Sequence, residues 1–212
     1  MVDRFQKKEV AVFDLDGTLL INNSYKVFLF TWFIFLILNR RIRTVHQLFL
    51  ILRKRLIKNS NRVATKRKVL ELYFKDRNDL YEKYLTSILF FFRRKSVVKR
   101  LEELKGEYII ILATAAYCFY AKPLAKKFGI SKIVCSTYGE MKKNKECNGL
   151  EKLKRIEANY GFTKFKYLFT DHIDDLPIAK KTNHVFLVNP AVDSRKKMIS
   201  YFKSTSKRFD IL

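Results

Sequence analysis

The fold of this 212-residue chain is decided by the stretch VAVFDLDGTL, residues 10–19. It begins with four apolar residues, continues through Asp14 and Asp16, and turns at Gly17. A short apolar run that ends at a glycine turn predicts a buried strand. Because ligands bind at the carboxyl ends of strands in a parallel α/β sheet, we expect the two acids to face a ligand site.

Two carboxylates this close together repel each other and lose hydration unless a cation or a proton compensates for them. A divalent metal ion would supply that compensation and leave one acid free for nucleophilic or proton-transfer chemistry. The alternative is a strand that ends in a solvated acidic turn, since Asp-Gly is a common turn sequence. The buried strand in front of Asp14 and Asp16 favours the site.

The composition predicts one domain, or a core with a small insert, because 48% of the residues are hydrophobic and only six are Gly and three Pro. Residues 1–9 contain no apolar run, so we expect no secretory signal. The cysteines Cys118, Cys135 and Cys147 are odd in number and lack the spacing of a zinc site. They predict free buried thiols in a reducing compartment.

The chain carries a formal charge of +24, from 44 Lys and Arg against 20 Asp and Glu. Residues 39–100 hold 19 basic but only 4 acidic residues, which is more than half of the excess. Such a field attracts polyanions: nucleic acid, anionic lipid headgroups or phosphorylated substrates. A solvated basic surface without a partner is the alternative, and composition does not choose between them.

Residues 27–38 are apolar at every position except Thr31, but this segment is too short to span a bilayer. It predicts a helix that is either buried in the core of an insert or placed in a membrane interface, since three arginines follow within residues 40–43. Helical periodicity continues through residues 45–95.

The next strand signal, residues 108–116, comes about 95 residues after the first, which is too long a gap for one crossover helix. We therefore expect an all-helical insert at residues 22–95, in a core formed by residues 1–21 and 96–212. The second strand ends near Thr114. Its hydroxyl and the backbone N–H groups of the next turn can bind phosphate oxygens at the start of a helix.

Further strands are predicted at residues 133–135 and 185–188, and a buried strand also precedes Asp171. Asp174 and Asp175 follow Asp171, and three acids within five residues stand out in so basic a chain. The alternative is an ordinary acidic loop. The C-terminal tail predicts a basic amphipathic helix.

In chain order, four motifs resemble those of the haloacid dehalogenase-like (HAD) superfamily. They are DxDGT at residues 14–18, the strand that ends at Thr114, Gly149-x-x-Lys152 at a helix start, and Asp171-x-x-x-Asp175. The helical insert resembles the C1 cap of the phosphoserine-phosphatase-like branch. The resemblance implies an α/β fold, with a Rossmann-like core whose parallel five-stranded sheet is flanked by helices, plus an inserted all-helical C1 cap.

The same resemblance selects among several neighbouring basic residues. Of the lysines Lys143, Lys145, Lys152 and Lys154, only Lys152 has the Gly-x-x-Lys spacing. His172 stands where the family usually has Ser, Gly or Thr. We expect it to be a loop residue, with a proton shuttle as the alternative.

The resemblance also implies the chemistry of the site. Mg²⁺ is expected to bind the carboxylates of Asp14 and Asp171 and the backbone carbonyl of Asp16, since oxygen ligands suit this ion. Asp14 is expected to be the nucleophile that forms an aspartyl-phosphate, with Asp16 as general acid and base. Asp175 would orient a bound water or the lysine. The phosphate oxygens are expected to be bound by Thr114, Ala115 and Lys152.

As the resemblance implies, dehalogenases lack the second acid and ion-pumping ATPases carry Thr in its place. Asp16 therefore favours an Mg-dependent phosphomonoester hydrolase acting on a small or lipid-linked phosphate. One alternative is a membrane-associated phosphatidylglycerophosphate-type lipid phosphatase, which the Cys-x-Gly-x-Glu-Lys string at residues 147–152 resembles. A phosphotransferase and a non-enzymatic polyanion-binding module on a HAD scaffold stay open. Phosphoserine specificity is disfavoured, because no acid between Thr18 and Glu71 is available to bind an amino group.

The expected partners are a phosphorylated small molecule or lipid and an anionic membrane surface. Nucleic acid is disfavoured because the chain has no aromatic–basic RNA motif, although its charge does not exclude it. We expect a cytoplasmic protein, with peripheral contact at the inner face of the membrane as a further hypothesis.

Overall fold

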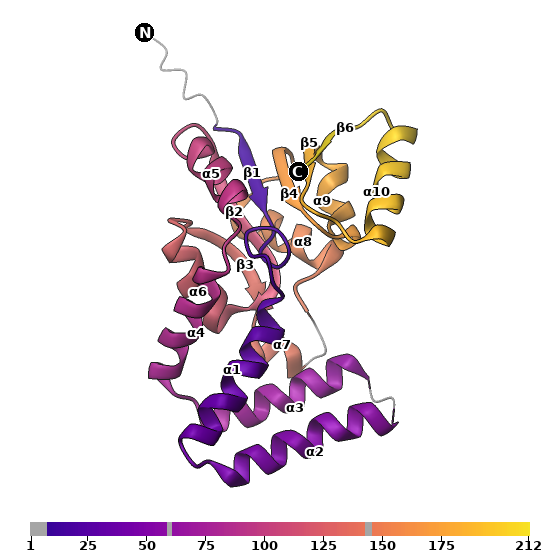
Figure 1. The fold of residues 1–212 in the computed structure, drawn as a ribbon. Helices are drawn as coiled ribbons and strands as arrows, with labels where there is room; N and C mark the ends of the chain where they lie inside the picture. Colours follow the sequence, from indigo (N-terminus) through magenta and orange to yellow (C-terminus); the bar gives the residue numbers. More distant parts are fainter. Residues whose placement is uncertain (1–7, 59–60, 143–145) are drawn as a thin grey trace.

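The computed structural model describes residues 8–58, 61–142 and 146–212 of the chain. Its strands form a parallel six-stranded sheet in the order β3-β2-β1-β4-β5-β6 (Figure 1). The strands are β1 Val10–Phe13, β2 Ile109–Tyr117, β3 Lys132–Ser136, β4 Phe165–Thr170, β5 Thr182–Leu187 and β6 Arg208–Ile211. The predicted α/β class is confirmed, with one strand more than the five expected.

Helices connect the strands and cover both faces of the sheet (Figure 1). The longer helices are α1 Ser24–Leu38, α2 Ile42–Lys58, α3 Arg62–Lys75, α4 Asp79–Phe91, α5 Lys95–Leu104, α6 Cys118–Lys127, α8 Gly149–Tyr160 and α10 Val192–Ser204. The shorter ones are α7 Tyr138–Lys142, the 3₁₀ helix η1 Ile173–Asp175 and α9 Leu176–Lys180.

Strand β1 lies in the middle of the sheet, and all of its side chains are buried. Ala11 and Phe13 belong to the hydrophobic cluster formed with α5 and α6, whereas Val10 and Val12 belong to the cluster formed with α8, α9 and α10. This division follows from the alternation of side chains along a strand. A strand that is buried on both faces must be apolar throughout, which explains why it was recognisable in the sequence.

Helices α1 to α4 lie beyond the carboxyl edge of the sheet (Figure 1). The backbone segments that lead into and out of them run side by side, since Ile21 N–H donates to the Phe92 carbonyl and Arg94 N–H to the Leu19 carbonyl, at 2.9 and 2.8 Å. Four consecutive helices are thus attached to the sheet through one pair of adjacent chain segments.

The apolar segment of residues 27–38 forms most of α1, and it is neither fully buried nor fully exposed. One side of the helix packs Phe28, Trp32 and Leu36 into the core. There, the rings of Phe28 and Trp32 lie edge-on to Tyr73, with ring centroids 5.1 and 5.4 Å apart. The opposite side, which includes Phe30, faces solvent.

The sixth strand, β6, was not predicted. The tail forms the expected helix α10, but residues 208–211 then pair with the edge strand β5. Most of β6 is exposed, and its sequence RFDI alternates charged and apolar residues. Backbone hydrogen bonds to β5 hold β6 in place. Its sequence therefore contains no apolar run from which the strand could be predicted.

The prediction of three free thiols is wrong. Cys118 and Cys135 form a disulfide, with their Cα atoms 5.3 Å apart, and Cys147 is the free and buried cysteine. The disulfide joins the first residue of α6 to β3. The spacing of the cysteines along the chain does not predict this contact. The expectation of a reducing compartment loses the support that it drew from free thiols.

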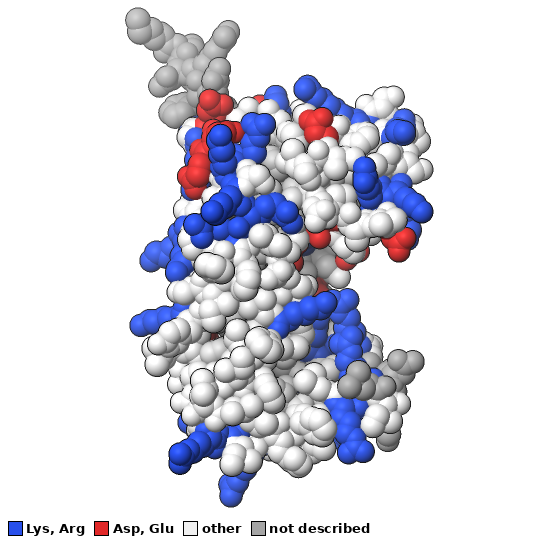
Figure 2. Space-filling model, viewed as in Figure 1, with Lys and Arg blue, Asp and Glu red and all other residues white. Residues whose placement is uncertain are grey.

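On the face shown in Figure 2, Lys and Arg side chains are scattered over both ends of a largely uncharged surface, and acidic ones lie over the part that contains the sheet. The surface over α1 and α4 is largely uncharged in this view, with Lys and Arg at its margins. In the described residues, no helix combines the length and the apolar character needed to cross a bilayer.

Candidate active site

The carboxyl ends of β1, β2 and β4 meet at one edge of the sheet and form the floor of a cavity of about 230 Å³. Every residue that the sequence singled out for chemistry lines this cavity: Asp14, Asp16, Thr114, Ala115, Lys152, Asp171 and Asp175. Residues up to 161 positions apart in the chain are therefore brought together, as parallel strands require.

Lys152 lies at the centre of this group. Its Nζ donates to Asp14 Oδ1 at 2.8 Å and to Asp175 Oδ1 at 2.7 Å, and all three side chains are buried. Burial alone would lower the pKa of Lys152, but the carboxylates of Asp14 and Asp175 outweigh it and hold that pKa above its usual value. Lys154, one of the competing lysines, is exposed, and Lys143 and Lys145 fall outside the described residues.

Asp175 is held in place from β4. Thr170, the last residue of that strand, donates its hydroxyl to Asp175 Oδ2 at 2.7 Å. With Lys152 on the other carboxylate oxygen, both oxygens of Asp175 are hydrogen-bonded. Asp175 can therefore hold the lysine in position.

The two acids at the end of β1 both have pKa values above the usual value. Burial raises the pKa of Asp14 well above its usual value; the Lys152 ammonium opposes this, while Asp175 and Asp171 add to it. Burial likewise raises the pKa of Asp16, although Ser24 N–H, at the start of α1, donates to Asp16 Oδ1 at 2.8 Å. Among the described residues that line the cavity, five carboxyl groups stand against the two basic side chains of Lys152 and Arg62, so acids outnumber bases where a cation would bind.

Gly17 lets the first and last loops approach each other. A Cβ atom built on Gly17 would lie 2.1 Å from Asp171 Oδ2, and φ at this glycine is +76°. A side chain here would collide with the carboxylate and adopt a disfavoured backbone conformation. Asp171 therefore lies against the backbone of the β1 loop, on the same side of the sheet as Asp14, and burial raises its pKa to about 6.

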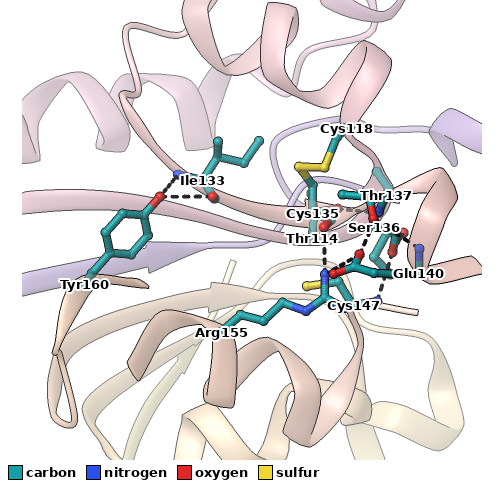
Figure 3. Close-up of a disulfide and its surroundings, with 12 residues drawn as sticks. Thr114, Cys118, Ile133, Cys135, Ser136, Thr137, Glu140, Cys147, Arg155 and Tyr160 are labelled. Carbon is teal, nitrogen blue, oxygen red and sulfur yellow. Dashed lines mark hydrogen bonds and ion pairs between the residues drawn. A yellow bond between two sulfur atoms is a disulfide. The ribbon is translucent and has the colours of Figure 1, made fainter. Parts of the chain in front are cut away.

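The carboxyl end of β2 is braced from β3. Ser136 donates its hydroxyl to the Ala115 carbonyl at 2.9 Å and accepts from Cys147 N–H at 2.9 Å (Figure 3). Next to it, the disulfide joins Cys118 to Cys135. Strand β2 continues to Tyr117, so the prediction that it ends at Thr114 is wrong, and no turn follows that residue directly. The last residues of β2 are thus connected to the segment that leads into α8 and Lys152.

Arg155, on α8, strengthens the same connection. Its guanidinium donates to the Cys135 carbonyl and to Glu140, each at 2.9 Å (Figure 3). Neither Ser136 nor Arg155 was predicted from the sequence as a site residue. A serine at a strand end and an arginine on a basic helix carry no local signal of such a role.

Other residues that line the cavity were also missed as site residues: Asn23, Arg62, Asn148 and Asp174. Arg62 comes from α3, within the helical insert, where basic residues are too frequent for one of them to be recognised. His172 lines the cavity too, and its Nδ1 accepts from Asp174 N–H at 3.2 Å, which accords with the expected loop role.

The donor atoms of the cavity fit a magnesium ion. Asp14 and Asp171 line the same cavity, and the charge of Asp171 contributes to the raised pKa of Asp14. Carboxylate and carbonyl oxygens are the ligands that Mg²⁺ takes, with water completing an octahedron. Among the described residues, no three His, Cys, Asp or Glu side chains form a metal site by themselves. The expected set needs only two such side chains, together with the Asp16 carbonyl.

Sequence comparison defines the family. Residues 11–180 match the haloacid dehalogenase-like hydrolase family. The match covers most of the chain, including every residue assigned to the cavity, so the chain belongs to this family. A comparison with curated proteins gave no match.

Solved structures with the same fold were also found. A protein of unknown function from Bordetella pertussis Tohama I is 15% identical, with a TM-score of 0.66 over 95% of this chain and 97% of that chain. A phosphoserine phosphohydrolase-like protein from Francisella tularensis subsp. tularensis SCHU S4 is 14% identical, with a TM-score of 0.55 over 95% and 94% of the two chains. A phospho-aspartyl intermediate analogue of phosphoserine phosphatase is 15% identical, with a TM-score of 0.54 over 91% of each chain. At such identities the likeness concerns the fold.

Proposed function

We propose that this member of the family is an Mg²⁺-dependent phosphomonoester hydrolase. The observation that supports this most is the buried contact of Lys152 with Asp14, at the sheet edge that also carries Asp171. The fold shared with phosphoserine phosphatase agrees with it. The substrate would be a small or lipid-linked phosphate.

Asp14 is the proposed nucleophile. Lys152 occupies its Oδ1, so the other oxygen can attack phosphorus, and the ester P–O bond breaks as an aspartyl-phosphate forms. The leaving alkoxide takes a proton from Asp16, whose raised pKa suits a general acid. Asp16 then removes a proton from water, which attacks phosphorus and releases phosphate and free Asp14.

The remaining residues of the cavity would bind the phosphoryl group. Thr114, the backbone N–H of Ala115 and Lys152 would hold its oxygens, where charge develops during transfer. Magnesium, bound by Asp14, Asp171 and the Asp16 carbonyl, would neutralise the phosphate and polarise it. Asp175 would position Lys152, as its hydrogen bond indicates.

We also propose that residues 22–95 form a cap domain on a core of residues 1–21 and 96–212. The adjacent backbone segments at Ile21 and Phe92 support this division. Arg62 brings a positive charge from the helical insert to the cavity, next to the acids at the end of β1. Such a cap would exclude water and select the leaving group.

The decisive experiment is Asp14→Asn with a generic aryl phosphate and Mg²⁺. We expect hydrolysis to fall by at least about a thousandfold, because the nucleophile is lost, while the circular dichroism spectrum stays native. Asp193→Asn, on α10, is the matched control and should retain activity. Full turnover in Asp14→Asn would contradict the proposal. Adding an alcohol acceptor and following its phosphorylation would distinguish a phosphotransferase.

A further inference from the structure

The outer side of α1 carries a second apolar face, which is exposed in the part of the chain that the structure describes. It consists of four residues at spacings of i, i+3, i+4 and i+7, namely Phe30, Phe33, Ile34 and Ile37. This spacing places them on one side of the helix. Phe30 has 67% of its surface exposed.

Helix α2 continues this pattern. Its exposed apolar residues are Ile42, Phe49, Leu50 and Ile57, at spacings of i, i+7, i+8 and i+15, which define one side of a helix. The exposed residues His46 and Arg53, at i+4 and i+11, lie on the same side. The two helices contact each other, and Leu38 and Ile42, both 76% exposed, flank the turn between them. We call these two sets of four residues the outer stripe.

Single exposed apolar residues are normal on a protein surface, but two consecutive helices with periodic apolar outer faces are not. A buried partner within the chain is excluded for the described residues, because the stripe is exposed with α3 and α4 already in place. Tyr81 of α4 packs against the inner part of α1, at Thr31 and Phe35, and leaves the stripe open.

The charged residues of α1, of α2 and of the turn between them are all basic, although Arg41 at that turn pairs with Asp76 at the end of α3, at 3.6 Å. No Asp or Glu occurs between residues 17 and 70, which include both helices. Arg40 and Arg43 lie at the turn between the helices, and Arg53, Lys54 and Arg55 lie along α2, all of them exposed. Figure 2 shows the uncharged surface over α1 with Lys and Arg at its margins.

We propose that the outer stripe docks on the surface of an anionic lipid bilayer. Apolar side chains of such a surface enter the boundary between headgroups and acyl chains, and flanking basic residues bind the anionic headgroups. A second copy of the chain would bring two basic rims together and so be repelled. A nucleic acid would match the charge but leave the apolar residues in water.

This docking would place the cavity close to the membrane. Helix α1 begins at Ser24, which hydrogen-bonds Asp16, and it ends in the outer stripe. The distance along the helix from Ser24 to Ile37 is about 20 Å at the rise of an α-helix. The inference is independent of the proposed hydrolysis, because binding to lipid requires no turnover.

Vesicle binding tests the inference. The full chain is sedimented with vesicles of phosphatidylglycerol and phosphatidylcholine in equal parts, and with vesicles of phosphatidylcholine alone. We expect binding to the anionic vesicles that weakens as salt is added. The double variant F30D/I37D should bind at least about tenfold more weakly. Val192→Asp, a matched control with 67% exposure on α10, should bind as the original chain does.

Several results would overturn the inference. One is that F30D/I37D binds vesicles as well as the original chain does, and another is that the original chain binds neutral and anionic vesicles equally. A third is that light scattering shows a dimer of the original chain but a monomer of F30D/I37D. Binding to RNA with none to vesicles would also overturn it. Hydrolysis of a soluble aryl phosphate, measured on the same samples, should be unchanged in F30D/I37D. Its absence from the original chain would contradict the hydrolase proposal alone.

Discussion

Lys152→Met offers the most direct test of how the buried carboxylates of the cavity are compensated. The substitution removes the ammonium that hydrogen-bonds Asp14 at 2.8 Å and Asp175 at 2.7 Å. Both carboxylates stay buried, and removing one partner of a buried ion pair costs about 3–5 kcal/mol. We expect the free energy of unfolding of the metal-free protein to fall by this amount at about pH 8.

The loss should depend on pH in a defined direction. Burial raises the pKa of Asp14, and Lys152 opposes the rise, so the substitution should raise that pKa further. A carboxyl group whose folded-state pKa lies above its unfolded value contributes stability at low pH, and that contribution is lost as pH rises through the folded pKa. Lys152→Met should therefore be much less destabilising at about pH 5 than at about pH 8.

Urea denaturation in the presence of a chelator measures both quantities. Lys154→Met is the matched control, since Lys154 is exposed on the same helix and should change stability by less than about 0.5 kcal/mol. Lys152→Arg keeps the positive charge but changes the shape of the side chain, so it shows which of the two the free energy of unfolding depends on. An equal loss at both pH values, or a loss below about 1 kcal/mol at the higher pH, would refute the reasoning.

Three further predictions concern the first loop, the metal and the disulfide. Gly17→Ala should abolish hydrolysis and destabilise the fold, because the added Cβ would collide with Asp171. Gly106→Ala is the control, since Gly106 has φ +92° and open space around it. It should lower the free energy of unfolding by only about 1–2 kcal/mol and keep activity. Mg²⁺ should raise the melting temperature more at about pH 8 than at about pH 5, because Asp171, with a pKa of about 6, must lose its proton to bind the ion; an equal rise would contradict this. Reduction of the Cys118–Cys135 bond, which closes a loop of 17 residues, should lower the free energy of unfolding by about 3 kcal/mol in urea, and an unchanged midpoint would show that the bond does not form.

The features that could be predicted from the sequence are those with a local signature. Strand β1 was recognisable because burial on both faces requires an uninterrupted apolar run. The residues of the cavity could be named because parallel strands bring their carboxyl ends to the same edge, so that Asp14 and Asp171 follow recognisable strands and Thr114 lies near the end of another. The identity of the lysine depended on a motif, because composition made four lysines equivalent.

Other features depend on contacts between segments that are distant in the chain. The disulfide requires α6 and β3 to lie side by side, and β6 is held by backbone pairing to β5 rather than by its side chains. The twelve-residue apolar run in α1 did not reveal which of its faces is covered, because that depends on where α3 and α4 pack. Hydrophobic periodicity and turn-forming residues act over a few positions and can therefore be recognised in the sequence. Which surfaces meet, and which stay exposed, is settled only when the elements pack together in three dimensions.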